Sequence, residues 1–153
     1  MNIRVEVDDN LIEEEIIIRC SQMNEKIYQI QKFVSDIASK AHRFVFFKGD
    51  TEYYLSLEEI LFFETEENSI SVHTLDNVYQ TKHKLYELEE LLPGYFMRVS
   101  KSAILNTNHI YSISRNITAS SIVQFQNTHK QVYVSRYYYK LLKQKLEEKR
   151  MRL

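Results

Sequence analysis

From Phe44 onward the hydrophobic residues come in short runs, and this pattern limits the fold more than any other feature of the 153-residue chain. Val, Ile, Tyr and Phe dominate runs such as RFVFFKG, TEYYLSL, ILFFETE, SISVHTL and VYQTKHK, a composition that favours strands. Residues that favour turns separate the runs at Gly49-Asp50, at 66–68 and at Asp76-Asn77. Short strands with regular polar breaks predict a mainly β body of small antiparallel sheets.

Two short helices are predicted within this body. Leu85, Leu88 and Leu92 have helical spacing, and Pro93-Gly94 ends that segment. Three more strands are predicted, in the runs HIYSISR, SIVQFQ and QVYVSR. The tail after them predicts an amphipathic helix whose inward side chains are Tyr138, Leu141, Leu142 and Leu146.

Residues 1–42 have a different texture and predict a β-β-α extension, which divides the chain into 1–42 and 43–153. The runs IRVEVD and EEIIIRC predict two strands. A helix with Ser21 as its N-cap is then predicted from one apolar stripe: Met23, Ile27, Ile30, Val34, Ile37 and Ala41. The stripe either packs on its own strands or on the β body, or it forms a dimer seam, because its 4-3 spacing is that of a coiled coil.

Catalytic and metal sites are not indicated by the sequence. With two glycines, the chain has no glycine-framed nucleophile and no glycine-rich phosphate loop. The five histidines lack close metal-ligand spacing, and the acidic run 64–67 is more simply a solvated turn than a cation site. We therefore expect no enzyme activity, no cofactor, no metal and no small-molecule substrate. Cys20 is the only cysteine, and the acidic start and short apolar runs do not predict a signal peptide or a membrane span, so a cytoplasmic protein is expected.

Charge is distributed unevenly along the chain. Segment 44–77 has one basic and eight acidic residues, whereas segment 78–153 has thirteen basic and five acidic residues. A basic second half suggests a polyanionic partner, although mixed protein surfaces also fluctuate in this way. Cations and polar side chains with reach for bases cluster at 81–84, 98–102, 106–109 and 134–140, as a nucleic-acid site needs.

In order along the chain, three segments resemble the LytTR family of bacterial DNA-binding domains. They are LEEILFFETEENSISVHT, then TKHKLYELEELLPGYFMRVSKSAILNTNHIYSI, which matches best, and finally QVYVSRYYYKLLKQKL. The resemblance covers about Phe44 to Glu148. It implies an elongated arrangement of small antiparallel sheets with short helices. It also implies a bacterial transcription regulator that binds specific double-stranded DNA sequences by placing loops in successive major grooves.

Roles follow from this resemblance by position. Base contacts are expected from Asn68, Lys101, Arg136 and Tyr137. Contacts to the DNA backbone are expected from Lys82, Lys84, Arg98, Ser100, Ser102, Asn106, Ser135 and Lys140. The chain departs from the family at Ser100, where His is frequent, and at Tyr137, where Arg or Lys is frequent. Base preference at Tyr137 is open, because Tyr cannot make the bidentate contact of Arg to guanine.

The partners implied by the resemblance are double-stranded DNA at repeated promoter sites, a second copy in a homodimer, and a small membrane regulatory protein. Residues 1–42 are too short for the phosphoacceptor receiver that often precedes this domain, so the chain resembles the stand-alone type. A rival interpretation assigns function to the acidic segment 44–77 and the predicted helix over 23–41. In that case the chain is a protein–protein interaction or dimerisation module without specific DNA binding.

Overall fold

A computed structural model describes residues 1–40, 44–116 and 120–151, and the side chains of 1–35, 44–116 and 120–151. The chain divides into two compact units, Met1–Ala38 and Ser39–Leu153. Each unit is described by itself.

Helix α1 (Glu25–Lys40) is the regular element of the first unit. Asn24 caps it, because its Oδ1 accepts a hydrogen bond from the backbone N–H of Ile27 at 3.0 Å. The predicted helix is therefore confirmed, but it begins after Ser21 and Met23. Ile27, Ile30 and Val34 are half-buried along one side, as the stripe predicts, whereas Ala41 lies outside the described residues.

The two strands predicted in residues 3–20 do not form. This segment is irregular, with a turn at Asp9-Asn10. The alternating side chains of Ile3, Val5 and Val7 are 91%, 82% and 87% exposed. A strand needs a paired neighbour and a face to bury, and an isolated hairpin is marginal in water. Apolar and polar residues do alternate in this segment, but the described part of the first unit contains no strand with which it could pair.

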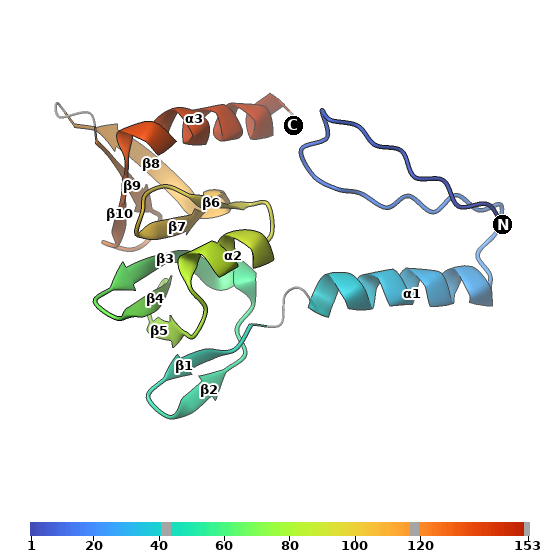
Figure 1. Cartoon of the computed structure of the whole chain (residues 1–153), viewed down its shortest axis with the longest axis horizontal. Helices are drawn as coiled ribbons and strands as arrows, with labels where there is room; N and C mark the ends of the chain where they lie inside the picture. Colours follow the sequence, from blue (N-terminus) through green and yellow to red (C-terminus); the bar gives the residue numbers. More distant parts are fainter. Residues whose placement is uncertain (41–43, 117–119, 152–153) are drawn as a thin grey trace. The chain divides into compact units, whose positions relative to one another are not determined.

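Ten antiparallel strands form the body of the second unit (Figure 1). A seven-stranded sheet has the order β2-β1-β5-β4-β3-β7-β6, and a three-stranded sheet has the order β10-β9-β8. The strands are β1 (Phe46–Lys48), β2 (Thr51–Tyr53), β3 (Ile60–Glu66), β4 (Ser69–Thr74), β5 (Val78–Thr81), β6 (Phe96–Arg98), β7 (Ala103–Asn106), β8 (Ile110–Arg115), β9 (Ser121–Phe125) and β10 (Gln131–Val134). The predicted mainly β fold is confirmed.

Short helices complete this unit. Helix α2 (Leu85–Leu91) follows β5 and buries Leu85 and Leu88, and helix α3 (Arg136–Met151) follows β10. Single 3₁₀ turns, η1 (Leu57–Glu59) and η2 (Thr107–His109), precede β3 and β8. No helix in the described part of the chain is both long and apolar enough to cross a bilayer.

Strand β3 is shared by two hydrophobic cores. Ile60 and Phe63 belong to the core covered by α2, whereas Leu61 and Phe62 belong to the core between the large sheet, the small sheet and α3. Strict alternation would not group the residues in this way. A register shift between Ile60 and Phe62 in the pairing with β4 accounts for it, because a bulge changes the face to which the chain points.

Helix α3 packs on the second core through a narrow stripe. Leu142 is fully buried, and Tyr138 and Leu146 are half-buried against the same core. Leu141 was predicted to face inward, but its side chain is 42% exposed. Adjacent helical residues point about 100° apart, so Leu141 and Leu142 cannot both face a narrow contact.

Replacing Leu142 with Ala should lower the free energy of unfolding by about 3 kcal/mol, because a fully buried leucine leaves a cavity. The matched substitution Leu141→Ala should change it by less than about 1 kcal/mol. Urea denaturation of both variants measures the difference. Equal losses would contradict the packing of α3 described here.

Candidate nucleic-acid interface

The four residues predicted to contact bases lie on three loops. Asn68 is in the two-residue turn between β3 and β4, and Lys101 is in the loop between β6 and β7. Arg136 and Tyr137 are the first residues of α3, directly after β10. All four side chains are exposed. The ammonium group of Lys101 makes no hydrogen bond or ion pair with any residue that the structure describes.

Backbone hydrogen bonds tie these three loops together. The N–H of Thr65, close to the β3–β4 turn, donates to the carbonyl of Ser102 at 2.8 Å. The N–H of Ser135, which precedes α3, donates to the carbonyl of Val99 at 2.8 Å. The loop from Val99 to Ser102 is therefore attached to the other two loops at its two ends. Side chains that are far apart in the sequence are held on one connected framework.

A shallow groove gathers part of the predicted set. Its lining includes Asn68, Lys84, Arg98 and Lys101, which come from four separate segments of the chain. Thr65, Glu67, Ser69, Ile70, Leu85 and Tyr86 complete the lining. Asn68 and Lys101, two of the residues predicted to contact bases, therefore lie beside Lys84 and Arg98, two of the residues predicted to contact the DNA backbone.

Arg98 holds the loop that carries Lys101. Its Nε donates to the carbonyl of Ser100 at 2.8 Å, and its Nη2 donates to the carbonyl of Lys101 at 2.6 Å. Its Nη1 pairs with the Oε2 of Glu89 on α2 at 3.2 Å. Three of the five guanidinium donors are therefore used within the chain. This arrangement makes Arg98 a positioning residue for the loop.

Three serines of the predicted set also have local structural partners. The Oγ of Ser100 accepts from the N–H of Ser102 at 3.1 Å, and the two Oγ atoms lie 3.3 Å apart. The Oγ of Ser135 lies 3.4 Å from the N–H of Tyr138, in the N-cap position of α3. These contacts narrow the conformations of the loops before any ligand binds.

Three lysines lie on the neighbouring surface. Lys82 is exposed, and its Nζ sits over the ring of Phe47 at 4.5 Å from the centroid. Lys84 is the exposed N-cap residue of α2, where its N–H donates to the Oε1 of Glu87 at 3.3 Å. Lys140 is exposed one turn after Arg136 on α3.

Asn106 does not belong to the DNA-contacting surface predicted for it. Its side chain is 1% exposed. Its Nδ2 donates to the carbonyl of Ile60 at 3.0 Å, and its Oδ1 accepts from the N–H of Asn108 at 2.9 Å. Buried polar groups are retained when they are hydrogen-bonded, so Asn106 joins β7 to the start of β3 and caps η2. That assignment was wrong.

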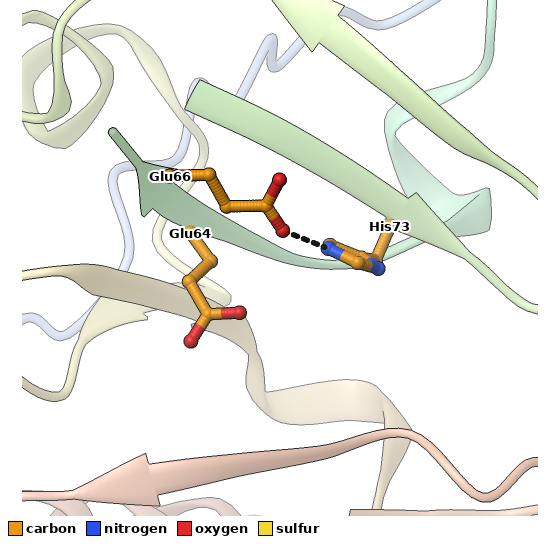
Figure 2. A group of neighbouring side chains, drawn as sticks. All are labelled: Glu64, Glu66 and His73. Carbon is orange, nitrogen blue, oxygen red and sulfur yellow. Dashed lines mark ion pairs between the residues drawn. The ribbon is translucent and has the colours of Figure 1, made fainter. Parts of the chain in front are cut away.

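A second polar cluster was not identified from the sequence. Glu64 and Glu66 on β3 and His73 on β4 offer ligand atoms within 4.8 Å of one another, and the carboxylate of Glu66 is directed at the imidazole of His73 (Figure 2). Burial, followed by the nearby charge of Lys130, lowers the pKa of His73 to about 4, and Glu66 acts in the opposite direction. Burial and the charge of Glu66 raise the pKa of Glu64. The signal was available, because a two-residue turn pairs Glu66 with Ser69 and places all three residues on one face.

Comparison with known families agrees with this geometry. The family described as the LytTr DNA-binding domain matches residues 50–147, which is more than half of the chain. The chain belongs to the LytTR family of DNA-binding domains. It thus carries a DNA-binding domain of the kind found in transcription regulators.

Relatives and a solved structure extend the match. The LytTR chain is 27% identical over 146 residues to proteins described as HTH-type transcriptional regulators in Staphylococcus aureus strains NCTC 8325 / PS 47 and COL. Each alignment covers 95% of this chain and 98% of the relative. A solved LytTr DNA-binding domain from Bacillus cereus has a TM-score of 0.62 at 24% identity. The superposition covers 67% of this chain and 94% of the Bacillus cereus domain, and it supports the fold.

The helix-turn-helix in the relatives' description has no counterpart in the described residues of this LytTR chain. Five strands separate α1 from α2, and another five separate α2 from α3. A helix-turn-helix needs two consecutive helices joined by a short turn.

Substituting Arg98 with Lys should loosen the loop, because an ammonium group cannot bridge two carbonyls and Glu89 with the same planar geometry. Amide hydrogen exchange at Thr65 and Ser135 should become roughly tenfold faster, which corresponds to about 1.4 kcal/mol of local stability. Lys101→Ala is the control, because only its backbone carbonyl takes part in this network. Unchanged exchange in Arg98→Lys would contradict the positioning role.

Proposed function

We propose that this chain is a transcription regulator that binds specific double-stranded DNA sequences through its loops, inserted in the major groove. The observation that carries the proposal is the framework of three loops joined by the bonds from Thr65 to Ser102 and from Ser135 to Val99. The bonds that hold the loops are between main-chain atoms, so the exposed cationic and amide side chains on the loops are left available for binding. Such groups are suited to reading base edges.

The proposed base contacts differ in chemistry. Lys101 and Arg136 donate to guanine O6 and N7, and Asn68 is suited to adenine N6 and N7. Tyr137 is 73% exposed, and its ring lies edge-on to Tyr138 at 5.0 Å between centroids. It can donate one hydrogen bond or pack on a thymine methyl group. We therefore expect weaker base discrimination at Tyr137 than an arginine would give.

Phosphate contacts are proposed for Lys82, Lys84 and Lys140, with Ser100, Ser102 and Ser135 as weaker partners. All three lysines are exposed, Lys84 lines the groove beside Asn68 and Lys101, and Lys140 follows Arg136 by one turn of α3. Point charges of this kind attract phosphates whatever the base sequence. Arg98 contributes by holding the Lys101 loop in place, and it is among the residues that line the same groove.

Protein association is the second proposed property, and residues 1–38 favour it. Several apolar side chains of this unit are exposed, including Ile16, Ile17 and Phe33 at 69%, 61% and 66%. A homodimer formed through this unit would place two DNA-binding domains on repeated half-sites and raise their effective concentration. A small membrane regulatory protein is the other proposed partner.

Light scattering should give twice the mass of one chain for the full protein, and the mass of a single chain would contradict the dimer.

DNA binding should depend strongly on salt. If about five phosphates are neutralised, log affinity should fall with log salt with a slope of about −4 to −5. Fluorescence anisotropy with a labelled duplex, first selected from random DNA, measures this slope. An affinity that does not change with salt would contradict DNA binding and favour the rival function, a protein-interaction module without specific DNA binding.

Lys101→Ala and Lys82→Ala separate reading from attraction in the same experiment. Lys101→Ala should cost about 1–3 kcal/mol on the selected duplex and little on a scrambled one. Lys82→Ala should weaken both duplexes alike and make the salt slope shallower by about one. The base-reading role of Lys101 is wrong if its variant loses affinity equally on both duplexes.

A further inference from the structure

We propose that Glu64, Glu66 and His73 form a binding site for one transition-metal dication of the Zn²⁺ class. The three residues come from β3 and β4, which pair directly in the large sheet. The site lies on the strands of the hairpin whose turn carries Asn68, and none of its three residues is a proposed DNA contact. The proposal does not depend on DNA binding.

The pairing of the two strands brings the three side chains to one face. Glu64 and Glu66 are two residues apart on β3, so their side chains leave the same face of the sheet. His73 pairs with Phe62 on that face, and the two rings stack at 4.2 Å between centroids. The stack fixes the plane of the imidazole, which lies beside the carboxylate of Glu66 in Figure 2.

The spacing of the donor atoms fits one shared ion. The Nε2 of His73 is 3.9 Å from the Oε1 of Glu66, which is too long for a hydrogen bond. Bonds from zinc to imidazole and carboxylate of roughly 2.1 Å each, at the tetrahedral angle, would place two ligands about 3.4 Å apart. One ligand atom from each of the three residues lies within 4.8 Å of the others. A small rotation of the exposed Glu66 side chain would bring its carboxylate closer to the imidazole.

His73 has a ligand's environment rather than that of a satisfied core histidine. Its side chain is 13% exposed, and both ring nitrogens are buried without a hydrogen-bond partner among the described residues. Buried polar atoms in native proteins are normally paired, so two orphaned nitrogens in one ring need an explanation. A cation on Nε2 would satisfy one of them.

The charges around the cluster also favour a dication. Glu64 is half-buried, and Glu66 is the neighbouring carboxylate that opposes its ionisation. Lys130 is the cation that acts on His73 from the β9–β10 connection. Its Nζ is directed to the carbonyls of Thr74 and Asn77, at 2.8 and 3.0 Å. Two carboxylates thus face one ammonium group that already has other partners.

The donor set selects the kind of ion. Imidazole nitrogen binds Zn²⁺ and its neighbours in the first transition row, whereas Mg²⁺ prefers oxygen ligands in a strict octahedron. Three protein ligands leave a coordination position for water. A bound ion would link the second half of β3 to the end of β4 and stiffen the hairpin.

The test is Zn²⁺ binding by the full chain carrying Cys20→Ser, so that the exposed thiol does not compete for the metal. Competition with a chromophoric chelator measures the affinity, and NMR of the imidazole nitrogens identifies the histidine that binds. One Zn²⁺ should bind through the Nε2 of His73, and excess Mg²⁺ should not displace it. Glu66→Gln and His73→Gln should each weaken binding by at least about tenfold, since even residues behind the ligands give losses of this size.

His83→Gln is the matched control, because the Nδ1 of His83 lies 3.5 Å from the Oε2 of Glu87 without a third ligand nearby among the described residues. It should leave Zn²⁺ affinity unchanged. Glu66→Gln is the primary variant, since its side chain is largely exposed and the fold does not rely on it. Equal Zn²⁺ affinity in Glu66→Gln and the parent, or an equal loss in His83→Gln, would overturn the proposal. No DNA is present, so the outcome is independent of the proposed DNA binding.

Discussion

The bulge in β3 is the constraint on which the rest of the second unit depends. By changing the face of the strand between Ile60 and Phe62, it directs Ile60 and Phe63 to one core and Leu61 and Phe62 to the other. Strand β7 pairs with β3 in matching register, so that Ile104 faces the first core and Leu105 the second. The two cores are thus joined through a shared wall of backbone hydrogen bonds. The pairing of β3 with β7 therefore sets the distance between the loops at the ends of these two strands.

The surface proposed to read DNA is ordered mainly by main-chain bonds and by Arg98. Its exposed ends, Asn68, Lys101 and Arg136, are not needed to hold the loops. This division reduces the ordering entropy that binding must overcome, while the reading groups stay in water until they meet a base. Two further polar residues stabilise the same loops. Asn106 is buried and joins β7 to the start of β3, and Ser135 caps α3 and donates its N–H to the loop at Val99. Polar residues in the run from Tyr95 to Ile110 therefore serve two purposes, support and exposure.

Local patterns in the sequence predicted most of the second unit, because alternation, helical spacing and turn residues are local properties. They predicted the strands, the helix stopped by Pro93 and the burial of Leu142. They failed where distant partners decide. Ile3, Val5 and Val7 alternate but have no sheet beside them. Asn106 was mistaken for a surface residue because its partner, the carbonyl of Ile60, is 46 residues away. The proximity of His73 to Glu66 was missed because it appears only when the runs of β3 and β4 are paired across their two-residue turn, and each run was interpreted alone.

The hydrogen bonds that hold the loops do not involve the side chains proposed to contact bases, and this affects how the DNA preference of such a domain can change during evolution. A substitution at Lys101 or Asn68 alters an exposed side chain but breaks none of the bonds that join the three loops. New DNA preferences can therefore be sampled one residue at a time with little penalty in stability, since exposed substitutions are usually nearly neutral. Arg98 and Asn106 lack this freedom, because Arg98 donates to the carbonyls of Ser100 and Lys101 in the loop, and Asn106 donates to the carbonyl of Ile60 at the start of β3. Divergence among relatives should then concentrate at the loop tips.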